Sequence, residues 1–250
     1  VGFGASGRNG GQVGSGWNQG QQKLEKQLGQ DAAHRLWEMT QDAKSLTRDL
    51  VNQFAPEAGY NTGVAEACFS DKEKINSHAM ASYLEKNYNY NEIECLNKSS
   101  LRGVIKSEAY SGGVIDWGAG HLHPLLYALG LAKAAEAAGA VLYEASLVQE
   151  VKNGSPNLVK TARGDVKADY VIHATNGYHT NLNRNQAAHV MPINNFIVAT
   201  EPLEYPREIL TKNIAVADSR FVLNYYRLSH DHRLISVSYT HLTLPTKRIV

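Results

Sequence analysis

The residues whose types and spacing most clearly indicate chemistry form a glycine-rich run at the start of the chain. Seven of the 21 glycines fall within the first sixteen residues. Glycine lets the backbone turn where a Cβ atom would clash, and it lets another group approach the backbone N–H groups closely. A phosphate-bearing cofactor is the usual partner, because unshielded N–H groups bind an anion directly. The run therefore predicts a loop that lies against such a cofactor.

Gly2, Gly4 and Gly7 match the spacing of the dinucleotide fingerprint G-x-G-x-x-G. That fingerprint works only between a strand and a helix, whereas a single residue precedes Gly2 and the Gly10-Gly11 pair interrupts any helix. We therefore interpret the run as a second cofactor loop, and we expect the main phosphate site to precede Val1 in a longer protein. A glycine-rich surface loop or linker is the alternative, although such linkers are usually filled with serine.

Two histidine pairs, His121 with His123 and His230 with His232, have a spacing that places both rings on one side of an extended segment. No array of Cys, Asp or Glu residues completes either ligand set, so we interpret both pairs as turn residues and predict no metal site. His121 remains a weak candidate for approach to the cofactor.

The run Tyr225-Tyr226-Arg227 alternates faces along a predicted strand. Strand aromatics are usually packing residues. An arginine beside a tyrosine on a sheet could also hold a carboxylate group of a substrate. Both interpretations remain open from the sequence.

The composition describes an ordinary globular protein, with 43% hydrophobic and 20% charged residues and a net charge of +1. This charge gives no reason to expect nucleic acid as a partner, and no apolar run is long enough to cross a membrane. Cys68 and Cys95 lack C-x-x-C spacing, which favours free thiols in a reducing compartment and hence the cytoplasm.

Hydrophobic periodicity predicts a mixed α/β chain with helices at residues 22–54 (broken near Gly29), 70–87 (capped by Ser70) and 125–138. We expect strands at 64–69, 110–116, 141–151, 158–162, 168–175, 191–200 and 220–228, with a turn at 229–232. The strand at 168–175 is nearly continuously apolar, which is typical of a strand covered on both faces. Ligands collect at the carboxyl ends of such strands, so Thr175 to Gly177 are candidate contacts.

Four blocks occur in order: Gly4-Ala-Ser-Gly-Arg-Asn-Gly-Gly-Gln12, Gly118-x-Gly-His-Leu-His-Pro124, Val148, and Ala174-Thr-Asn-Gly177. Together they resemble the FAD-dependent oxidoreductases of the D-amino-acid oxidase superfamily. The segments at 199–203 and 224–228 make the resemblance greatest to the gamma-glutamylputrescine oxidoreductase branch.

The resemblance implies FAD as the cofactor and assigns three groups of contacts. The loop would lie along the pyrophosphate and flavin, Val148 would meet the adenine, and residues 174–177 would close over the dinucleotide. The expected cofactor-binding residues are Ala5, Ser6, Arg8, Asn9, Gly10, Gly11, Gln12, Val148, Ala174, Thr175 and Gly177.

The resemblance also implies an incomplete FAD-binding dinucleotide domain, formed by residues 1–70 and 110–182 without the first strand and phosphate loop. An interleaved, partial substrate domain with a mixed sheet would comprise residues 71–109 and 183–235. We expect residues 236–250 to be a non-native tail, since residues 237–246 resemble a translated sequencing adapter.

The implied activity is oxidation of a small amine to an imine, which hydrolyses to an aldehyde with loss of ammonia, while molecular oxygen or another acceptor reoxidises the flavin. Oxygen would yield hydrogen peroxide. A gamma-glutamylputrescine-like substrate is expected, the catalytic residues are unknown, and we expect the chain itself to be inactive. The alternatives are a D-amino-acid or glycine oxidase or dehydrogenase, a nicotinamide-dependent protein, and a non-enzymatic dinucleotide-binding module.

Overall fold

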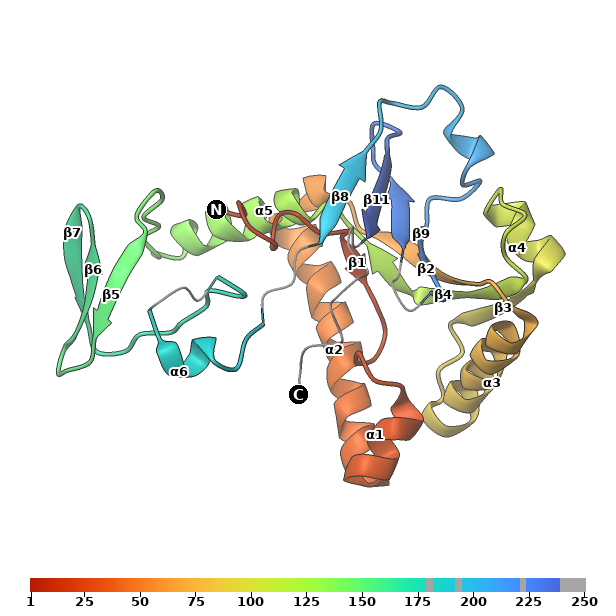
Figure 1. Ribbon diagram of the computed structural model, residues 1–250, viewed down its shortest axis with the longest axis horizontal. Coiled ribbons are helices and arrows are strands. Elements are labelled where there is room, and N and C mark those ends of the chain that lie inside the picture. The colour runs from red at the N-terminus through yellow and green to blue at the C-terminus, as the bar shows by residue number, and fades with distance from the viewer. Residues whose placement is uncertain (179–181, 192–194, 221–223, 239–250) are drawn as a thin grey trace, which may run out of the picture. The chain divides into compact units, whose positions relative to one another are not determined.

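The computed structural model describes residues 1–178, 182–191, 195–220 and 224–238. The chain divides into two compact units (Figure 1). The larger unit comprises Gly2–Ala134 and Asn195–Val250, and the smaller unit comprises Val1 and Ala135–Asn194.

The larger unit is built on a mixed eight-stranded sheet with the order β1-β4-β2-β9-β10-β11-β8, in which β3 also pairs with β4. All neighbouring strands are antiparallel except β2 and β9, which are parallel. β1 and β3 share the edge of β4 that does not face β2, because β1 pairs with residues 120–121 and β3 with residues 112–116. The strands are β1 (Gln12–Val13), β2 (Asn61–Cys68), β3 (Ile93–Asn97), β4 (Gly112–His121), β8 (Phe196–Ala199), β9 (Ala215–Asp218), β10 (Tyr225–Leu228) and β11 (Leu234–Ser238).

Helices α1 (Gln21–Leu28) and α2 (Gln30–Phe54) form a hairpin around Gly29. A buried hydrogen bond from Gln21 Nε2 to the carbonyl of Ala33 joins the two helices. The short 3-10 helix η1 (Pro56–Ala58) follows α2, and a second one, η2 (Pro206–Glu208), lies between β8 and β9.

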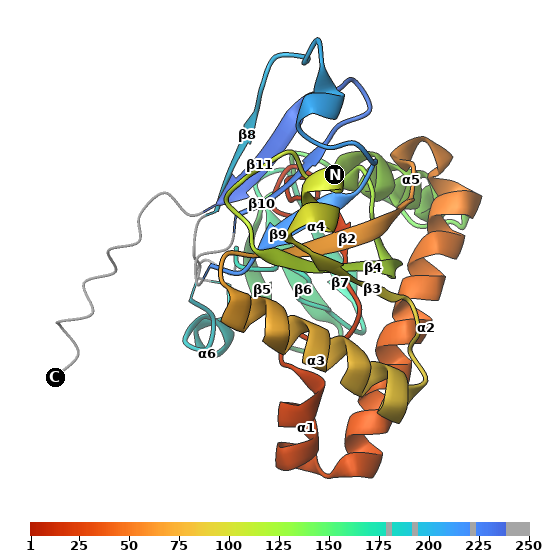
Figure 2. The same cartoon turned by 90° about the vertical axis from the view of Figure 1, so that its right-hand side faces the viewer.

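Helix α3 (Asp71–Tyr88) lies across the β2, β3 and β4 part of the sheet (Figure 2). It begins with a capping box, in which the Ser70 side chain accepts from the backbone of Glu73 and the Glu73 side chain accepts from the backbone of Ser70. His78 Nε2 makes a hydrogen bond to the carbonyl of Gly113 at 2.9 Å, so the helix is fixed to β4 by polar contacts as well as by packing.

The main hydrophobic core of the larger unit lies where β2, β4 and β9 meet helix α4 (Lys98–Val104) and the segment before β9. Its largest fully buried side chains are Leu101, Ile115, Leu210, Ile214 and Val216. A second core cluster lies around Val51 and Leu122, where the end of α2 packs near the start of α5 (Pro124–Ala137). These clusters hold in place the chain segments that surround the candidate site.

The smaller unit contains a three-stranded antiparallel meander of β5 (Val148–Lys152), β6 (Asn157–Thr161) and β7 (Gly164–Ala168), and the short helix α6 (Arg184–Ala187). The predicted strand at 168–175 is wrong, because β7 ends at Ala168 and no strand follows it in the described part of this unit. Tyr170 and Ile172 are each 89% exposed. An apolar run becomes a buried strand only where a neighbouring strand pairs with it and layers cover it, and the described residues of this unit supply neither.

The mixed α/β fold, the helices at 22–54, 70–87 and 125–138, and the turn at 229–232 are confirmed. Several strand boundaries differ from the prediction: β4 continues to His121, and β5 begins only at Val148. Strand β11 extends through Ser238, while residues 239–250 lie outside the described residues. The tail at 236–250 and the domain boundaries therefore stay predictions. Within the described residues, no helix combines the length and apolar character that a membrane span requires.

Candidate functional site

The glycine-rich loop is a compact structure of its own. The N–H groups of Gly7 and Arg8 both donate to the carbonyl of Gly4 at 3.2 Å. The Asn9 side chain closes the loop, because its Nδ2 donates to the carbonyls of Ala5 and Ser6 and its Oδ1 accepts from Gly11 N. Asn9 therefore shapes the loop from within.

The end of the loop is attached to the sheet at several points. Strand β1 pairs Gln12 with His121, and Leu122 N donates to the carbonyl of Gly11 at 2.8 Å. Gln12 Nε2 donates to the carbonyl of Val216 on β9. Arg227 on β10 donates from Nε to the carbonyl of Gly10 at 2.8 Å. The loop is thus held by three strands that lie far from it in the sequence.

The three buried glycines of the loop are required by the protein's own packing. A Cβ atom at Gly7 would lie 2.0 Å from the carbonyl oxygen of Gly2, and one at Gly10 would lie 2.4 Å from the Tyr225 ring. A Cβ atom at Gly11, where φ is +71°, would lie 2.0 Å from the carbonyl oxygen of Leu122. The sequence indicated close approach by a cofactor, whereas these glycines allow close approach between chain segments.

The opposite side of the loop is open. Ala5, Ser6, Arg8 and Asn9 are exposed, and the Arg8 guanidinium stacks over the Phe3 ring at 4.7 Å. A hydroxyl and a guanidinium are donors that suit phosphate oxygens. The donor types on this exposed face therefore fit the pyrophosphate of a dinucleotide.

The other predicted cofactor contacts belong to the smaller unit. Val148 is the first residue of β5 and pairs with Thr161. Ala174, Thr175 and Gly177 lie beyond β7. A turn at residues 176–177 is closed by Tyr178 N, which donates to the carbonyl of Thr175, and Gly177 N donates to Asn176 Oδ1. Their assignment as FAD contacts stays a prediction.

The larger unit contains a cavity of about 1000 Å³ beside the attachment of the loop. Four segments line it: residues 56–61, 121–126, 206–213 and 227–232, with some positions skipped. The cavity brings together the two histidine pairs noted in the sequence. Among the described residues, no group of three or more His, Cys, Asp or Glu side chains is arranged to hold a metal ion.

Two side chains of the cavity wall are almost fully buried. His121 is 2% exposed, and its Nε2 makes a hydrogen bond to the carbonyl of Asn213 at 3.3 Å. Burial lowers the pKa of His121 to about 4, and the nearby Arg227 cation acts in the same direction. His121 is therefore a neutral ring at pH 7. Arg227 is 5% exposed, and burial also lowers its pKa.

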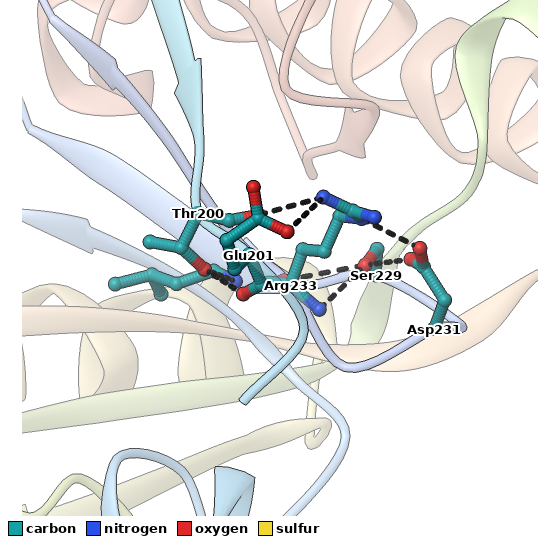
Figure 3. Close-up of polar contacts among 6 residues, drawn as sticks. Thr200, Glu201, Ser229, Asp231 and Arg233 are labelled. Atoms are coloured by element: carbon teal, nitrogen blue, oxygen red, sulfur yellow. Dashed lines mark hydrogen bonds and ion pairs between the residues drawn. The ribbon is translucent and has the colours of Figure 1, made fainter. Parts of the chain in front are cut away.

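The hairpin between β10 and β11 forms one wall of the cavity and is fixed by a cluster of polar contacts (Figure 3). Arg233 donates from Nε to Asp231 at 2.7 Å and from Nη1 to the carbonyl of Thr200 at 3.0 Å. Ser229 donates to Asp231 at 2.5 Å. Hydrogen bonds from Ser229 and Arg233 lower the pKa of Asp231 to about 2. Asp231 is therefore a carboxylate, and the guanidinium of Arg233 balances its negative charge.

A buried polar network that sequence reasoning missed lies just after the loop. Lys44 of α2 donates from Nζ to Ser15 Oγ at 2.7 Å and to Tyr90 Oη at 3.0 Å. Tyr90 in turn donates to Asp116 of β4 at 2.6 Å. Burial lowers the pKa of Lys44. These residues are too far apart in the chain for any sequence pattern to group them.

The comparison with protein families gives one match, over residues 1–246, to the family described as FAD dependent oxidoreductase. The chain is 36% identical over 247 residues to the Haemophilus influenzae protein named Probable oxidoreductase OrdL. It is 33% identical over 238 residues to gamma-glutamylputrescine oxidoreductase of Escherichia coli K12. Each alignment covers 94% of this chain and 56% of the relative, so the chain spans about half the length of these curated relatives.

Among solved structures, the fold is similar to glycine oxidase from Bacillus cereus, with a TM-score of 0.70 and 19% identity over 94% of this chain and 63% of that one. This similarity confirms the predicted fold. The family match confirms the expected superfamily and its cofactor type. The glycine-rich loop, the mixed sheet that holds it and the family match together show that the chain belongs to the FAD-dependent oxidoreductases.

Proposed function

We propose that the protein binds FAD against the loop at residues 4–12 and oxidises a small amine at the carbon that bears the nitrogen. The observation that carries the proposal is the architecture of this loop. Its inner face is fixed to β4, β9 and β10, while its outer face presents Ser6 and Arg8. A fixed loop with exposed donors is preorganised for an anionic cofactor, which reduces the entropy lost on binding.

The residues divide into three roles in this proposal. The loop, with Ala5, Ser6, Arg8, Asn9, Gly10, Gly11 and Gln12, lies along the pyrophosphate and flavin, and its exposed Ser6 and Arg8 side chains donate to phosphate oxygens. Val148 contacts the adenine, and Ala174, Thr175 and Gly177 close over the dinucleotide. FAD, when bound, supplies the acceptor for the hydride. The protein positions the amine and excludes water from it.

The substrate amine must be neutral before hydride removal, because a protonated amine has no lone pair to support the developing imine. A dry pocket lowers the pKa of an amine and so favours its neutral form. Water would then hydrolyse the imine to an aldehyde and ammonia, and bound FAD would pass the two electrons of the hydride to molecular oxygen, which would leave as hydrogen peroxide. The relative from Escherichia coli is named for gamma-glutamylputrescine, which supports a substrate of this type.

An alternative within the same family is oxidation of glycine or a D-amino acid. The similarity to glycine oxidase supports this candidate only at the level of the fold. A nicotinamide-dependent activity has less support, since the family match is to FAD-dependent proteins. Cys68 and Cys95 are free thiols, which supports a cytoplasmic location.

A direct test measures hydrogen peroxide and ammonia release by the product of the complete gene, loaded with FAD. Gamma-glutamylputrescine, glycine and D-alanine are compared at equal concentration. We expect the highest kcat/KM with gamma-glutamylputrescine. A preference for glycine or D-alanine would select the alternative, and flavin that stays oxidised on anaerobic addition of each amine would refute amine oxidation.

The loop assignment is tested separately by titrating FAD into the 250-residue chain and following flavin fluorescence. We expect FAD to bind to the chain. Arg8→Gln should weaken this binding about tenfold if one charge-assisted contact of roughly 1.4 kcal/mol is lost. Arg102→Gln is the matched control, because Arg102 is an exposed cation of α4 that contacts Glu108 rather than the loop.

A further inference from the structure

Helix α2 carries a line of apolar side chains that the described part of the larger unit leaves partly or fully exposed. One side of the helix is buried and holds Ala33, Trp37, Lys44 and Val51. Beside that buried side, apolar residues recur at alternating spacings of four and three, and they are Ala32, Leu36, Met39, Ala43, Leu46 and Leu50. We call these six residues the α2 stripe. Met39 is 59% exposed and Leu46 is 58% exposed.

The spacing of the α2 stripe is that of a coiled-coil seam. Apolar residues three and four apart form a narrow line along a helix, and such a line packs against the equivalent line of another helix. The stripe runs for about 27 Å along α2, which lies at the margin of the larger unit (Figure 2). Trp17 is 48% exposed and adds apolar surface beside the stripe, because its Nε1 donates to the carbonyl of Leu36 at 2.9 Å. A continuous exposed apolar surface of this kind indicates a protein partner.

One flank of the α2 stripe is charged. Arg35, Asp42 and Asp49 recur every seven residues, and each directly precedes a residue of the stripe. All three are exposed, and none forms an ion pair in the part of the chain that the structure describes. Charged residues that flank a coiled-coil seam contact the neighbouring helix, so they select its identity and its direction.

We propose that the α2 stripe is the interface between two antiparallel copies of this chain, related by a two-fold axis. In the register that we assign, Leu36 of one copy packs on Leu46 of the other, and Met39 packs on Ala43. The two-fold axis repeats both contacts, so each copy contributes the same surface. A long Met39 side chain opposite the small Ala43 suits the interdigitation of large and small residues. The interface is independent of the proposed function, because no residue of the stripe lies in the loop at 4–12 or lines the cavity.

The charged flank selects this register and this direction. Arg35 of one copy lies beside Asp49 of the other, twice in the symmetric pair, while Asp42 meets its own symmetry mate. Sliding one helix by one heptad would instead bring Asp42 beside Asp49 twice, which is repulsive. A parallel pair would place the charged flank against residues 33, 40 and 47, which carry no charge. Of these arrangements, only the assigned register contains attractive ion pairs.

The first experiment measures dimerisation of the 250-residue chain by sedimentation velocity, over about a hundredfold range of concentration. We expect a reversible dimer. Met39→Glu and Leu46→Glu place a charge in the apolar seam, and each should weaken the dimer at least about tenfold, or roughly 1.4 kcal/mol. Ile75→Glu is the matched control, because Ile75 is 62% exposed on α3 and lies outside the stripe. A chain that stays monomeric at every concentration, or a dimer that Ile75→Glu weakens equally, would overturn the proposal.

The second experiment reverses the charges of the flank. Arg35→Glu and Asp49→Arg each turn two attractive pairs into two repulsive ones, and each should weaken the dimer about tenfold, or roughly 1.4 kcal/mol. The double variant Arg35→Glu with Asp49→Arg restores both pairs with opposite sign, so it should dimerise as the unchanged chain does. Asp42→Asn removes the like-charge contact at the centre and should strengthen the dimer. If the double variant dimerises no better than the single variants, the assigned register is wrong.

Disulfide cross-linking distinguishes the two directions of pairing. Cys95→Ser first removes the exposed thiol. Leu36→Cys chains and Leu46→Cys chains are then oxidised separately and as a mixture. The antiparallel register brings position 36 of one chain opposite position 46 of the other, whereas two copies of position 36 lie about 15 Å apart along the helices, beyond the reach of a disulfide. We expect a cross-linked dimer from the mixture alone, and cross-linking of either variant by itself in preference to the mixture would overturn the antiparallel assignment.

The same cross-link is sought in the product of the complete gene. We expect it to form there as it does in the 250-residue chain. Its absence from the complete protein would overturn the proposal, because another part of the longer protein would then cover the stripe in place of a second copy.

Discussion

Replacement of Gly11 by alanine is the most direct perturbation of the junction between the loop and the sheet. Gly11 has φ of +71°, and an added Cβ atom would lie 2.0 Å from the carbonyl oxygen of Leu122 and 3.2 Å from Pro124. The obstacle is the backbone of Leu122, the residue that follows β4, and the N–H of Leu122 is itself hydrogen-bonded to the carbonyl of Gly11. The clash therefore cannot be relieved by rotating a side chain, and the β1–β4 contact must shift.

Two costs contribute to the expected loss of stability. Placing a non-glycine residue in the left-handed region costs about 1–2 kcal/mol. Overpacking against a fixed neighbour adds about 1–3 kcal/mol. Gly11→Ala should thus lower the free energy of unfolding of the larger unit by about 2–5 kcal/mol, provided the two terms add.

Urea unfolding followed by tryptophan fluorescence measures this loss, because all three tryptophans (Trp17, Trp37 and Trp117) lie in the larger unit. The matched control is Gly14→Ala in the same segment. A Cβ atom at Gly14 has nothing within 4 Å, and its φ lies outside the left-handed region. The control should change stability by less than about 0.5 kcal/mol. If Gly11→Ala is no more destabilising than Gly14→Ala, the loop is not attached to the sheet as described.

Three further predictions use the same unfolding assay. Tyr90→Phe removes the hydroxyl at the centre of the buried lysine network and should lower the free energy of unfolding by about 1–3 kcal/mol. The control Tyr205→Phe, at a 61% exposed tyrosine, should change it by under about 0.5 kcal/mol. Equal effects of the two substitutions would contradict the network. Burial lowers the pKa of His121 from 6.5 to about 4, so the unfolded chain takes up a proton between these values that the folded chain does not. The folded state therefore loses up to about 3 kcal/mol of stability relative to the unfolded state as the pH falls from 6.5 to 4. His121→Gln should flatten this part of the curve of unfolding free energy against pH. An unchanged curve would show that burial does not protect His121 from protonation. Ser70→Ala removes the N-cap of α3 and should lower the free energy of unfolding by about 1 kcal/mol. The control Ser82→Ala, at an exposed position of the same helix, should leave it nearly unchanged. Similar losses for both variants would argue against the capping box.

The local elements were predictable because their signals are local. The 3.6-residue periodicity at 22–54, the break at Gly29 and the cap at Ser70 each act within a few residues along the chain. The apolar run at 168–175 shows the limit of such reasoning. Its composition matches a buried strand, yet a strand forms only when a partner strand and covering layers are present.

The sequence by itself determined the family, the mixed α/β class and the position of the glycine-rich loop, because these depend on ordered motifs and short-range spacing. Only the tertiary structure decided what the loop's glycines and Arg227 do. Gly10 and Arg227 are 217 residues apart, and they meet because the sheet order places β10 within reach of the loop that precedes β1. Contacts of that kind follow from strand pairing across the whole larger unit, and no local pattern of residues encodes them.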